Sequence, residues 1–167
     1  MSYDEHKQAA QNTPVRAGVI TVSDTRTEAT DTSGRYIVES LAAAGVEIIE
    51  ARIVPDIPER IESALDELVT HCEVIVTTGG TGISRRDTTI EVVTRKFERT
   101  LPGFGEIFRM LSYEEIGSGA MLSRAVAGMW SNVLVFSLPG SSHAVRLAID
   151  QLILPEIHHL VWEMIRQ

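Results

Sequence analysis

Cysteine is almost absent from this chain of 167 residues, which contains Cys72 and no other. A single thiol cannot form a disulfide within the chain, and it cannot supply the several cysteines of a zinc cage. We therefore expect Cys72 to be a small buried residue in a reducing compartment. A domain of this size buries roughly 70% of the surface that its unfolded form exposes, so its fold needs no such cross-link.

Positive charge is scarce as well, since 15 Lys and Arg residues stand against 23 Asp and Glu residues, for a formal net charge of −8. Non-specific nucleic-acid binding depends on an excess of Lys and Arg, so we expect no nucleic-acid partner. A local basic pocket for a phosphate stays compatible with this balance.

Long apolar runs are also missing, because no segment approaches the ~18–20 apolar residues of a membrane span. Residues 1–12 contain no apolar signal-peptide core. These two absences predict a soluble, cytoplasmic protein without a membrane partner.

The composition that is present is that of an ordinary globular domain, with 44% hydrophobic and 23% charged residues. Residues 1–14 are polar and lack a regular apolar period, which predicts a mobile N-terminal arm. We expect residues 15–167 to form a single domain.

Apolar, β-branched runs alternate with segments of helical apolar spacing along that domain. The runs predict strands at residues 15–23, 46–54, 73–78, 125–129 and 132–138. The helical spacing predicts a helix capped by Ser33 or Thr32 and ended by Gly45, and further helices at residues 59–70, from 88, at 104–115, at 142–154 and after Pro155. This alternation is typical of a three-layer, Rossmann-like α/β sandwich, in which helices cover both faces of a mostly parallel sheet.

Three polar loops follow predicted strands, at residues 24–34, 79–87 and 139–142. In parallel sheets ligands bind beyond the carboxyl ends of the strands, at the switch in strand order. We therefore expect these loops to gather at one edge and to form the functional site.

Four consecutive residues, Gly79, Gly80, Thr81 and Gly82, stand between a predicted strand and a predicted helix. Glycines in that position let the backbone approach an anion closely and turn its N–H groups toward it. Their spacing fits neither the Walker loop nor the dinucleotide fingerprint. A tight strand-to-helix turn explains the glycines equally well.

Carboxylates accompany these loops. Asp87 follows Arg85 and Arg86, and two guanidinium groups beside a carboxylate suit a phosphate and its magnesium ion, although Asp87 could also cap the next helix. Asp56 could face the same pocket, but its spacing between two prolines favours a turn residue. Asp24 directly follows the first strand, where it either accepts a ligand hydrogen bond or makes an Asx turn.

The histidines give little functional indication. His143 and the adjacent pair His158 and His159 lack metal-ligand spacing, and we interpret the pair as surface residues. Since no Ser-His-Asp or Cys-His arrangement is visible, covalent catalysis is not indicated.

Several short motifs occur in order from about residue 15 to the C-terminus. They are Val22-Ser23-Asp24, Asp31-Thr32-Ser33-Gly34, Thr78-Gly79-Gly80-Thr81-Gly82, Arg86-Asp87, Pro102-Gly103-Phe104-Gly105-Glu106, Ser123-Arg124 and Leu138-Pro139-Gly140-Ser141. The ordered set resembles the MoaB/MogA family of molybdenum cofactor biosynthesis, whose fold also occurs in plant Cnx and animal gephyrin proteins. Residues 108–117, with the turn at 139–141, are more similar to MoaB than to MogA.

The resemblance implies a molybdopterin-binding domain that adenylylates molybdopterin with Mg-ATP and releases pyrophosphate. It implies catalytic and magnesium-binding roles for Asp56 and Asp87, and no tightly bound cofactor. On the nucleotide side it implies contacts with Ser23, Asp24, Gly79, Gly80, Thr81, Gly82, Met121 and Leu122. On the pterin side it implies contacts with Ser123, Arg124, Pro139, Gly140 and Ser141.

Two other functions stay open at this point. The first is a non-catalytic MoaB-type paralogue that binds molybdopterin or only assembles. The second is a Rossmann-like nucleotide binder outside the pathway, against which the ordered motifs argue.

The resemblance also implies self-association as a trimer or hexamer, and contacts with other proteins of the pathway. Apolar residues after the third strand–helix unit would suit an interface between copies, or they would fill the core of the monomer. They are Phe104, Ile107, Phe108, Leu111, Met121, Leu122, Met129 and Trp130.

Overall fold

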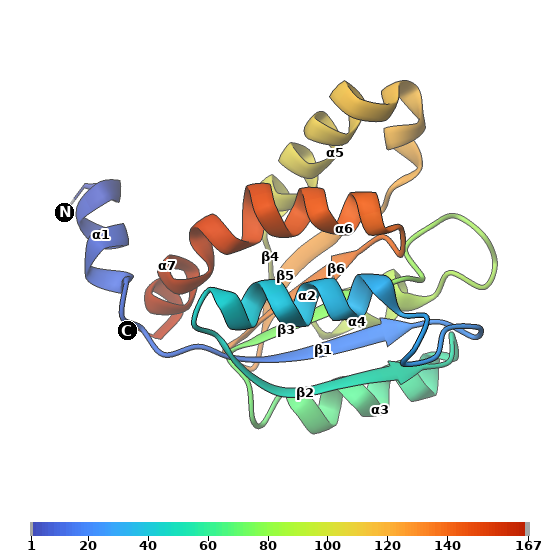
Figure 1. Cartoon of the computed structure of the whole chain (residues 1–167), viewed down its shortest axis with the longest axis horizontal. Helices are drawn as coiled ribbons and strands as arrows, with labels where there is room; N and C mark the ends of the chain where they lie inside the picture. The colour runs from blue at the N-terminus through green and yellow to red at the C-terminus, as the bar shows by residue number, and fades with distance from the viewer. Residues whose placement is uncertain (1, 166–167) are drawn as a thin grey trace.

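The structure, a computed structural model, describes residues 2–165 and is built on one six-stranded sheet (Figure 1). Residue 1 of the predicted arm and residues 166–167 of the predicted domain lie outside the described residues. The strands are β1 (Arg16–Val22), β2 (Glu47–Val54), β3 (Val74–Thr78), β4 (Arg99–Thr100), β5 (Val126–Trp130) and β6 (Val133–Leu138).

The strand order across the sheet is β2-β1-β3-β6-β5-β4. β1, β2, β3 and β6 run parallel, whereas β5 pairs antiparallel with β6 and β4 pairs antiparallel with β5. The sheet is therefore mostly parallel, as the sequence predicts.

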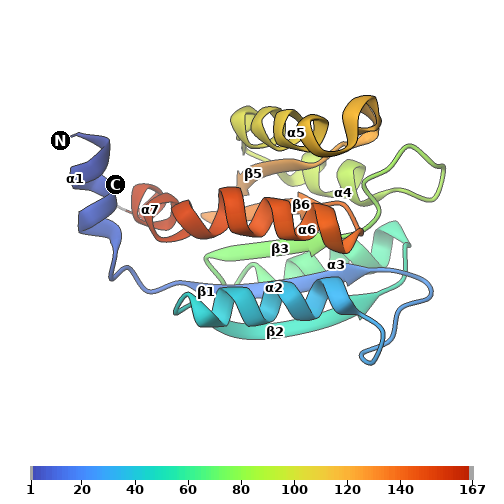
Figure 2. The same ribbon diagram turned by 45° about the horizontal axis from the view of Figure 1, so that its top comes forward.

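Helices cover both faces of the sheet (Figures 1 and 2), which confirms the three-layer architecture. α2 and α6 lie on one face, and α3 and α4 lie on the other. The helices are α1 (Tyr3–Ala10), α2 (Thr32–Ala43), α3 (Pro58–Leu68), α4 (Thr89–Lys96), α5 (Pro102–Ile116), α6 (Ser142–Ala148) and α7 (Leu154–Ile165). A 3-10 helix (Gly117–Leu122) follows α5, and a π-helical turn (Ile149–Ile153) joins α6 to α7.

The core consists of two apolar layers, because successive side chains of a strand point to opposite faces. In β1, Ala17 and Val19 pack in the layer of α2, α6 and α7, whereas Ile20 and Val22 pack in the layer of α3 and α4. Every residue of β3 and β6 is buried. Burial on both faces is typical of the central strands of a parallel sheet, and it fixes the strand ends on which the loops stand.

Cys72 is buried at 5% exposure, as expected, and burial raises the pKa of its thiol to about 11. Among residues 2–165, none of the helices has both the length and the apolar character that crossing a membrane requires.

The N-terminal segment differs from the mobile arm that we expected, because residues 3–10 form α1. The Ser2 side chain accepts a hydrogen bond from the Glu5 N–H at 3.4 Å, and the Glu5 carboxylate accepts one from the Ser2 N–H at 2.6 Å. Such a capping box starts a helix without any apolar stripe. α1 then packs on α7 through polar and aromatic side chains, which is why the apolar pattern gives no sign of it.

The predicted helix boundary at Pro155 is also wrong. Proline lacks an N–H donor and its ring crowds the preceding turn, which normally ends or kinks a helix. Here a π-helical turn, which is wider than an α-helical turn, comes just before Pro155. Pro155 then lies in the first turn of α7, and the helix continues through it. On α7, His158 and His159 are half-buried rather than surface residues. The ring nitrogens of His158 lie 2.9 Å from the Thr13 carbonyl oxygen and 3.1 Å from that of Ala44.

Candidate functional site

The carboxyl ends of β1, β2, β3 and β6 lie at one edge of the sheet, on the right in Figure 1. From β1 the chain moves outward to β2 and then crosses back to β3 on the other side of β1. This reversal makes the gap between the ends of β1 and β3 a topological switch point, where open α/β sheets bind their ligands. The loops that leave these strands carry most of the predicted site residues.

A sharp turn at Gly79 and Gly80 leaves β3 at the switch point. Their φ angles are +98° and +67°, in the left-handed region that favours glycine. The Gly79 N–H donates to the Leu138 carbonyl at 3.0 Å, which ties the turn to the end of β6. A Cβ atom on Gly79 would lie less than 3.0 Å from the Val22 carbonyl oxygen at the end of β1. The turn therefore requires glycine for both its conformation and its space.

Thr89, the first residue of α4, packs directly against Gly80. Its N–H donates to the Gly80 carbonyl at 3.2 Å, and a Cβ atom on Gly80 would lie less than 3.0 Å from the Thr89 hydroxyl. Thr89 is 0% exposed, and its hydroxyl has no hydrogen-bond partner in the described part of the chain. A buried polar group without a partner costs free energy, and this cost accompanies the close packing of Thr89 on Gly80. A threonine at the start of a helix is the one sign of this hydroxyl in the sequence.

Asp56 reaches the same turn from the loop after β2. Its Oδ1 accepts a hydrogen bond from the Thr88 hydroxyl at 2.9 Å, and its Oδ2 would lie 3.3 Å from a Cβ atom on Gly80. The Asp56 N–H donates to Asp24 Oδ1 at 3.1 Å, and the other oxygen of Asp24 pairs with Arg86. Asp24 therefore joins two loops instead of making an Asx turn.

Asp87 lies on the neighbouring part of the glycine loop. Its Oδ2 accepts the Ser84 N–H at 2.8 Å and would lie 2.8 Å from a Cβ atom on Gly82. The N-cap residue of α4 is Thr88, so Asp87 does not cap that helix. Asp87 instead faces a cavity of about 390 Å³, whose lining residues are Ile83, Ser84, Arg85, Asp87, Thr88, Glu91 and Arg124.

Arg124 holds the glycine loop in place from the side of β5. Its Nε donates to the Gly82 carbonyl at 2.8 Å, and its Nη2 donates to the Asp87 carbonyl at 3.0 Å. The guanidinium also hydrogen-bonds Glu91, and this bond lowers the pKa of the Glu91 carboxyl. We expected Arg124 on the pterin side, and the structure adds that it positions the carbonyls of the loop.

A second, smaller cavity of about 110 Å³ opens at the switch point itself. Its lining residues are Thr21, Val22, Ser23, Arg26, Asp31, Ser33, Thr78, Gly79 and Gly140. Ser23, Gly79 and Gly140 were predicted site residues, whereas Arg26, Asp31 and Ser33 were not. Polar side chains are common in every loop, so only their position in the fold distinguishes these three.

Asp31 has a structural role in this loop that the sequence analysis did not predict. It is buried, and it accepts the Thr21 hydroxyl at 2.6 Å and the Gly34 N–H at 2.8 Å. Asp31 thus caps α2, and the predicted caps Ser33 and Thr32 are wrong. The Ser33 hydroxyl instead donates to the Gly140 carbonyl at 3.1 Å, because the end of β6 lies beside the start of α2.

The remaining predicted site residues make hydrogen bonds or are exposed, and none of them lines either cavity. The Pro139 carbonyl accepts a hydrogen bond from the Thr78 hydroxyl at 2.9 Å. The Thr81 carbonyl accepts one from the backbone N–H of Arg124 at 3.3 Å. Ser141 caps α6, where it accepts the Ala144 N–H at 3.3 Å. Ser123 likewise accepts a local bond, from the Ala125 N–H at 3.3 Å. Met121 and Leu122 line neither cavity, and they are 76% and 53% exposed.

Size does not identify the site, because a larger cavity of about 530 Å³ lies between α2 and β2. It shares Thr21 and Asp31 with the switch-point cavity but contains none of the predicted site residues. The conformation of the glycine turn and the grouping of carboxylates around it are the more specific features.

Comparison with known proteins agrees with this geometry. A family model described as "Probable molybdopterin binding domain" matches residues 18–159. Molybdenum cofactor biosynthesis protein B of Bacillus cereus is 49% identical over 170 residues, which cover 100% of both chains.

Solved structures show the same similarity in three dimensions. A crystal structure of a molybdenum cofactor biosynthesis protein B superposes with a TM-score of 0.88 and 49% identity, covering 92% of this chain and 98% of that one. The tungsten cofactor synthesizing protein MoaB from Pyrococcus furiosus gives 0.82 and 43%, covering 88% of this chain and 94% of that one. This chain therefore belongs to the MoaB/MogA family of molybdopterin-binding domains.

Proposed function

We propose that this chain works in molybdenum cofactor biosynthesis and adenylylates molybdopterin with Mg-ATP. The observation that carries the proposal is the Gly79-Gly80 turn at the switch point. There, left-handed backbone, a buried hydroxyl without a partner and the Asp56 carboxylate lie together. Membership of the family supports the pathway and the substrate, and the turn supports a site that handles phosphate.

The reaction joins two phosphate groups. An oxygen of the terminal phosphate of molybdopterin attacks the α-phosphorus of ATP, the bond from that phosphorus to the bridging oxygen breaks, and pyrophosphate leaves. Transfers of this kind depend on positioning and charge neutralisation more than on a protein nucleophile. That requirement suits a site made of glycine backbone, carboxylates and guanidinium groups.

In our assignment the ATP phosphates lie along residues 79–82, beside Ser23 and Asp24, and the pterin approaches from Pro139, Gly140 and Ser141. The two sides meet where a Cβ atom on Gly140 would lie 3.4 Å from Gly79 Cα. Arg85 and Arg124 line the adjoining cavity and offer positive charge to phosphate oxygens.

Asp56 and Asp87 are suited to hold the magnesium ion that accompanies ATP. Within residues 2–165, Asp56 Oδ2 and Asp87 Oδ1 accept no hydrogen bond, while the other oxygen of each accepts one. Each carboxylate is thus fixed through one oxygen and keeps the other for a cation, and carboxylate oxygens are ligands that Mg²⁺ prefers. The bound ion would neutralise charge on the phosphates, and the two side chains would orient it.

Incubation of the purified chain with molybdopterin and Mg-ATP tests the proposal, with the products separated and identified by mass. Adenylylated molybdopterin and pyrophosphate are the expected products. A chain that binds molybdopterin without forming either product is the non-catalytic paralogue instead.

A further inference from the structure

Imidazole and carboxylate side chains gather between α1 and α7. Figure 1 shows these two helices at the end of the molecule opposite the candidate site. His6 comes from α1, and His159 and Glu163 come from α7. One ring nitrogen of each histidine and one carboxylate oxygen of Glu163 all lie within 4.8 Å of one another. Within residues 2–165 this is the one group of three such ligands that is close enough to share a metal ion.

The printed distances between the ligand atoms lie on either side of the spacing in a four-coordinate metal site. His6 Nδ1 lies 2.6 Å from Glu163 Oε1, and His159 Nε2 lies 3.6 Å from the same oxygen. In a tetrahedral zinc site with bonds of about 2.0–2.1 Å, neighbouring ligand atoms lie ~3.3 Å apart. His159 and Glu163 are four residues apart on one helix, so both side chains point to the same side. Small side-chain rotations would therefore bring all three ligands onto one ion.

His159 is already oriented for this task. Its Nδ1 lies 2.9 Å from Glu156 Oε2, and its Nε2 is turned toward Glu163. A carboxylate on the far nitrogen is the arrangement that fixes the ring of a metal-bound histidine. Lys7 Nζ lies 2.6 Å from the other oxygen of Glu156, so a basic residue of α1 anchors that carboxylate.

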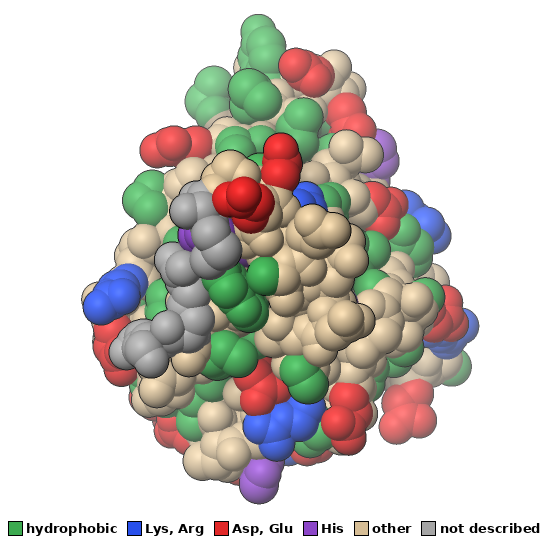
Figure 3. All heavy atoms as spheres, turned by 90° about the vertical axis from the view of Figure 1, so that its left-hand side faces the viewer, with side chains coloured by type: hydrophobic (Ala, Val, Ile, Leu, Met, Phe, Trp, Pro, Cys, Tyr) green, Lys and Arg blue, Asp and Glu red, His purple; other side chains and the backbone are tan. Residues whose placement is uncertain are grey.

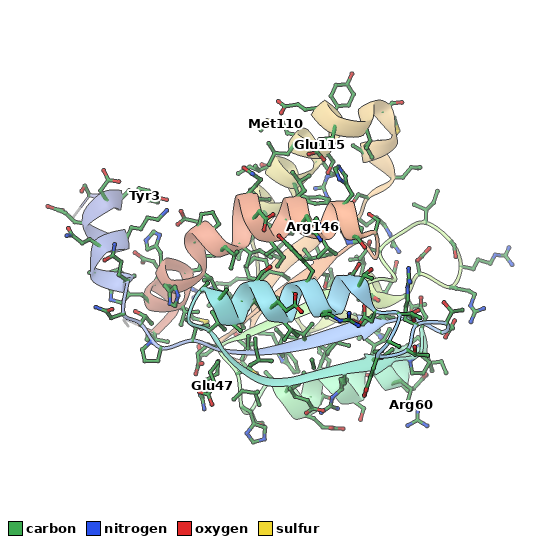
Figure 4. The ribbon with its side chains drawn as sticks, in the orientation of Figure 1. Tyr3, Glu47, Arg60, Met110, Glu115 and Arg146 are labelled. Atoms are coloured by element: carbon green, nitrogen blue, oxygen red, sulfur yellow. The ribbon has the colours of Figure 1, made fainter. Side chains whose placement is uncertain are left out.

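The three side chains of the cluster, His6, His159 and Glu163, are mostly buried but keep some contact with solvent. The side chains of His6, His159 and Glu163 are 17%, 13% and 33% exposed. The Tyr3 ring packs edge-on against His159 at 5.3 Å between centroids, and Figure 4 places Tyr3 on α1. Figure 3 views this end of the molecule, where acidic side chains reach the surface. An ion could enter, and the surrounding rings would limit its hydration.

We propose that His6, His159 and Glu163 bind one zinc ion, with water as the fourth ligand, and that the ion joins α1 to α7. Two imidazole nitrogens and one carboxylate oxygen suit Zn²⁺, whereas Mg²⁺ prefers oxygen ligands throughout. The cluster lies between α1 and α7, at the end of the molecule opposite the glycine turn, so the site is separate from the proposed catalytic one.

The test uses the full chain without a histidine tag, stripped of metal by a chelator and titrated with Zn²⁺ in a calorimeter. We expect one Zn²⁺ per chain and no comparable binding of Mg²⁺. His6→Gln and Glu163→Gln should each weaken Zn²⁺ binding by at least about tenfold, because each removes a ligand atom. His143→Gln is the matched control, since His143 Nε2 lies 2.5 Å from Glu115 Oε2 outside the cluster, and it should bind Zn²⁺ like the wild type.

Amide hydrogen exchange supplies a second readout that reports on α1 directly. Zn²⁺ should slow exchange across residues 3–10 in the wild type and in His143→Gln, but not in His6→Gln. Absence of stoichiometric Zn²⁺ binding by the wild type would overturn the proposal. Wild-type affinity in both His6→Gln and Glu163→Gln would overturn it equally. Adenylyl transfer plays no part in either readout, so the proposal stands or fails independently of the catalytic one.

Discussion

Asp87 is fixed by its own loop, because its Oδ2 accepts the Ser84 N–H at 2.8 Å, while its other oxygen accepts no hydrogen bond from the described residues. We predict that Asp87→Asn keeps the fold, since asparagine has the same shape and retains an oxygen for that hydrogen bond. Without the negative charge, the magnesium ion and the phosphates lose a positioning group, and adenylyl transfer should fall by about 100-fold or more. Turnover of molybdopterin with Mg-ATP, with circular dichroism as the check on folding, measures the effect.

Asp66→Asn is the matched control, because Asp66 lies on α3 and pairs with Lys96 instead of facing the glycine loop. It should leave the rate unchanged. Asp56→Asn should resemble Asp87→Asn if both carboxylates hold the same ion. A normal rate in Asp87→Asn would remove this residue from the catalytic assignment.

The role of Gly80 can be tested by comparison with Gly45, which has a similar left-handed backbone conformation. Gly45 has φ +84° with no atom within 4 Å of a Cβ position, whereas Gly80 at φ +67° also meets Thr89. Gly45→Ala should lower the free energy of unfolding by about 1–2 kcal/mol through its left-handed backbone. Gly80→Ala should lower it by about 1 kcal/mol more, because the added methyl group overlaps the Thr89 hydroxyl.

Calorimetry with Mg-ATP separates the two variants further. Gly45→Ala should bind ATP like the wild type, and Gly80→Ala should lose most of its affinity because the turn is displaced. Equal ATP affinities in both variants would place the phosphate site away from this turn.

The sequence indicates the role of a single residue where that role depends on the backbone conformation of the residue itself. It does not indicate the role where contacts between distant parts of the chain determine it. For Gly79 and Gly80 the sequence left a phosphate-binding loop and a tight turn equally open, and the structure has a sharp turn there, because few other residues suit positive φ. The unpartnered hydroxyl of Thr89 and the burial of Asp31 depend on chain segments that meet only in the fold. No local pattern contains that information.

Between elements, Arg124 connects β5 to the glycine loop and to Glu91 on α4. We predict that Arg124→Gln lowers the free energy of unfolding at neutral pH by about 1–3 kcal/mol, because hydrogen bonds to two carbonyls and one carboxylate are lost. Denaturant unfolding of the wild type and the variant measures the difference.

Part of that difference should depend on pH, with a definite sign. The bond from Arg124 lowers the pKa of Glu91 below its ordinary value of 4.5 in the folded state. The pair therefore stabilises the fold above pH 4.5, and its contribution is lost as the pH falls through the lower folded value. The difference in free energy of unfolding between the wild type and Arg124→Gln should therefore become smaller in acid. It should not reach zero, because the hydrogen bonds from Arg124 to the two carbonyl groups do not depend on pH in this range. A difference that widens in acid would contradict this explanation. In a Glu91→Gln background, the destabilisation by Arg124→Gln should not narrow in acid, because no carboxylate of that pair remains to titrate.

Elements were predicted well wherever their apolar period was strong. The five longer strands and the helices between them follow from that pattern, because burial on a sheet imposes it. α1 has no apolar stripe, and β4 contains only Arg99 and Thr100, so neither leaves a periodic signal. The continuous passage through Pro155 depends on a π-helical turn, which composition does not indicate.

At the scale of the whole molecule, α5 presents an apolar face away from the sheet. Ile107, Met110, Tyr113 and Ile116 are 45%, 55%, 63% and 59% exposed. Figure 3 shows hydrophobic side chains gathered at the top of the molecule, and Figure 4 places Met110 there on α5. Phe108, by contrast, is buried in the core of the monomer, so the apolar residues of this segment divide between core and surface.

We propose that a second copy of the chain covers this face, as part of a trimer or of a hexamer made from two trimers. Light scattering after gel filtration should give three or six times the chain mass of 18.4 kDa. Met110→Glu should reduce that mass, because it places charge on the apolar face, whereas Ile57→Glu, at an exposed position before α3, should not. A mass near 18.4 kDa for the wild type at micromolar concentration would refute the assembly.

We propose that the glycine turn and its carboxylates transfer an adenylyl group to molybdopterin. The most direct measurement supplies ATP labelled in its α-phosphate, together with Mg²⁺ and molybdopterin, and follows the label. We predict that the label moves to the pterin, with one pyrophosphate released for each pterin labelled, and that Asp87→Asn fails to move it. A wild-type chain that binds molybdopterin and Mg-ATP but leaves the label in ATP, or releases it as free AMP, would contradict the claim.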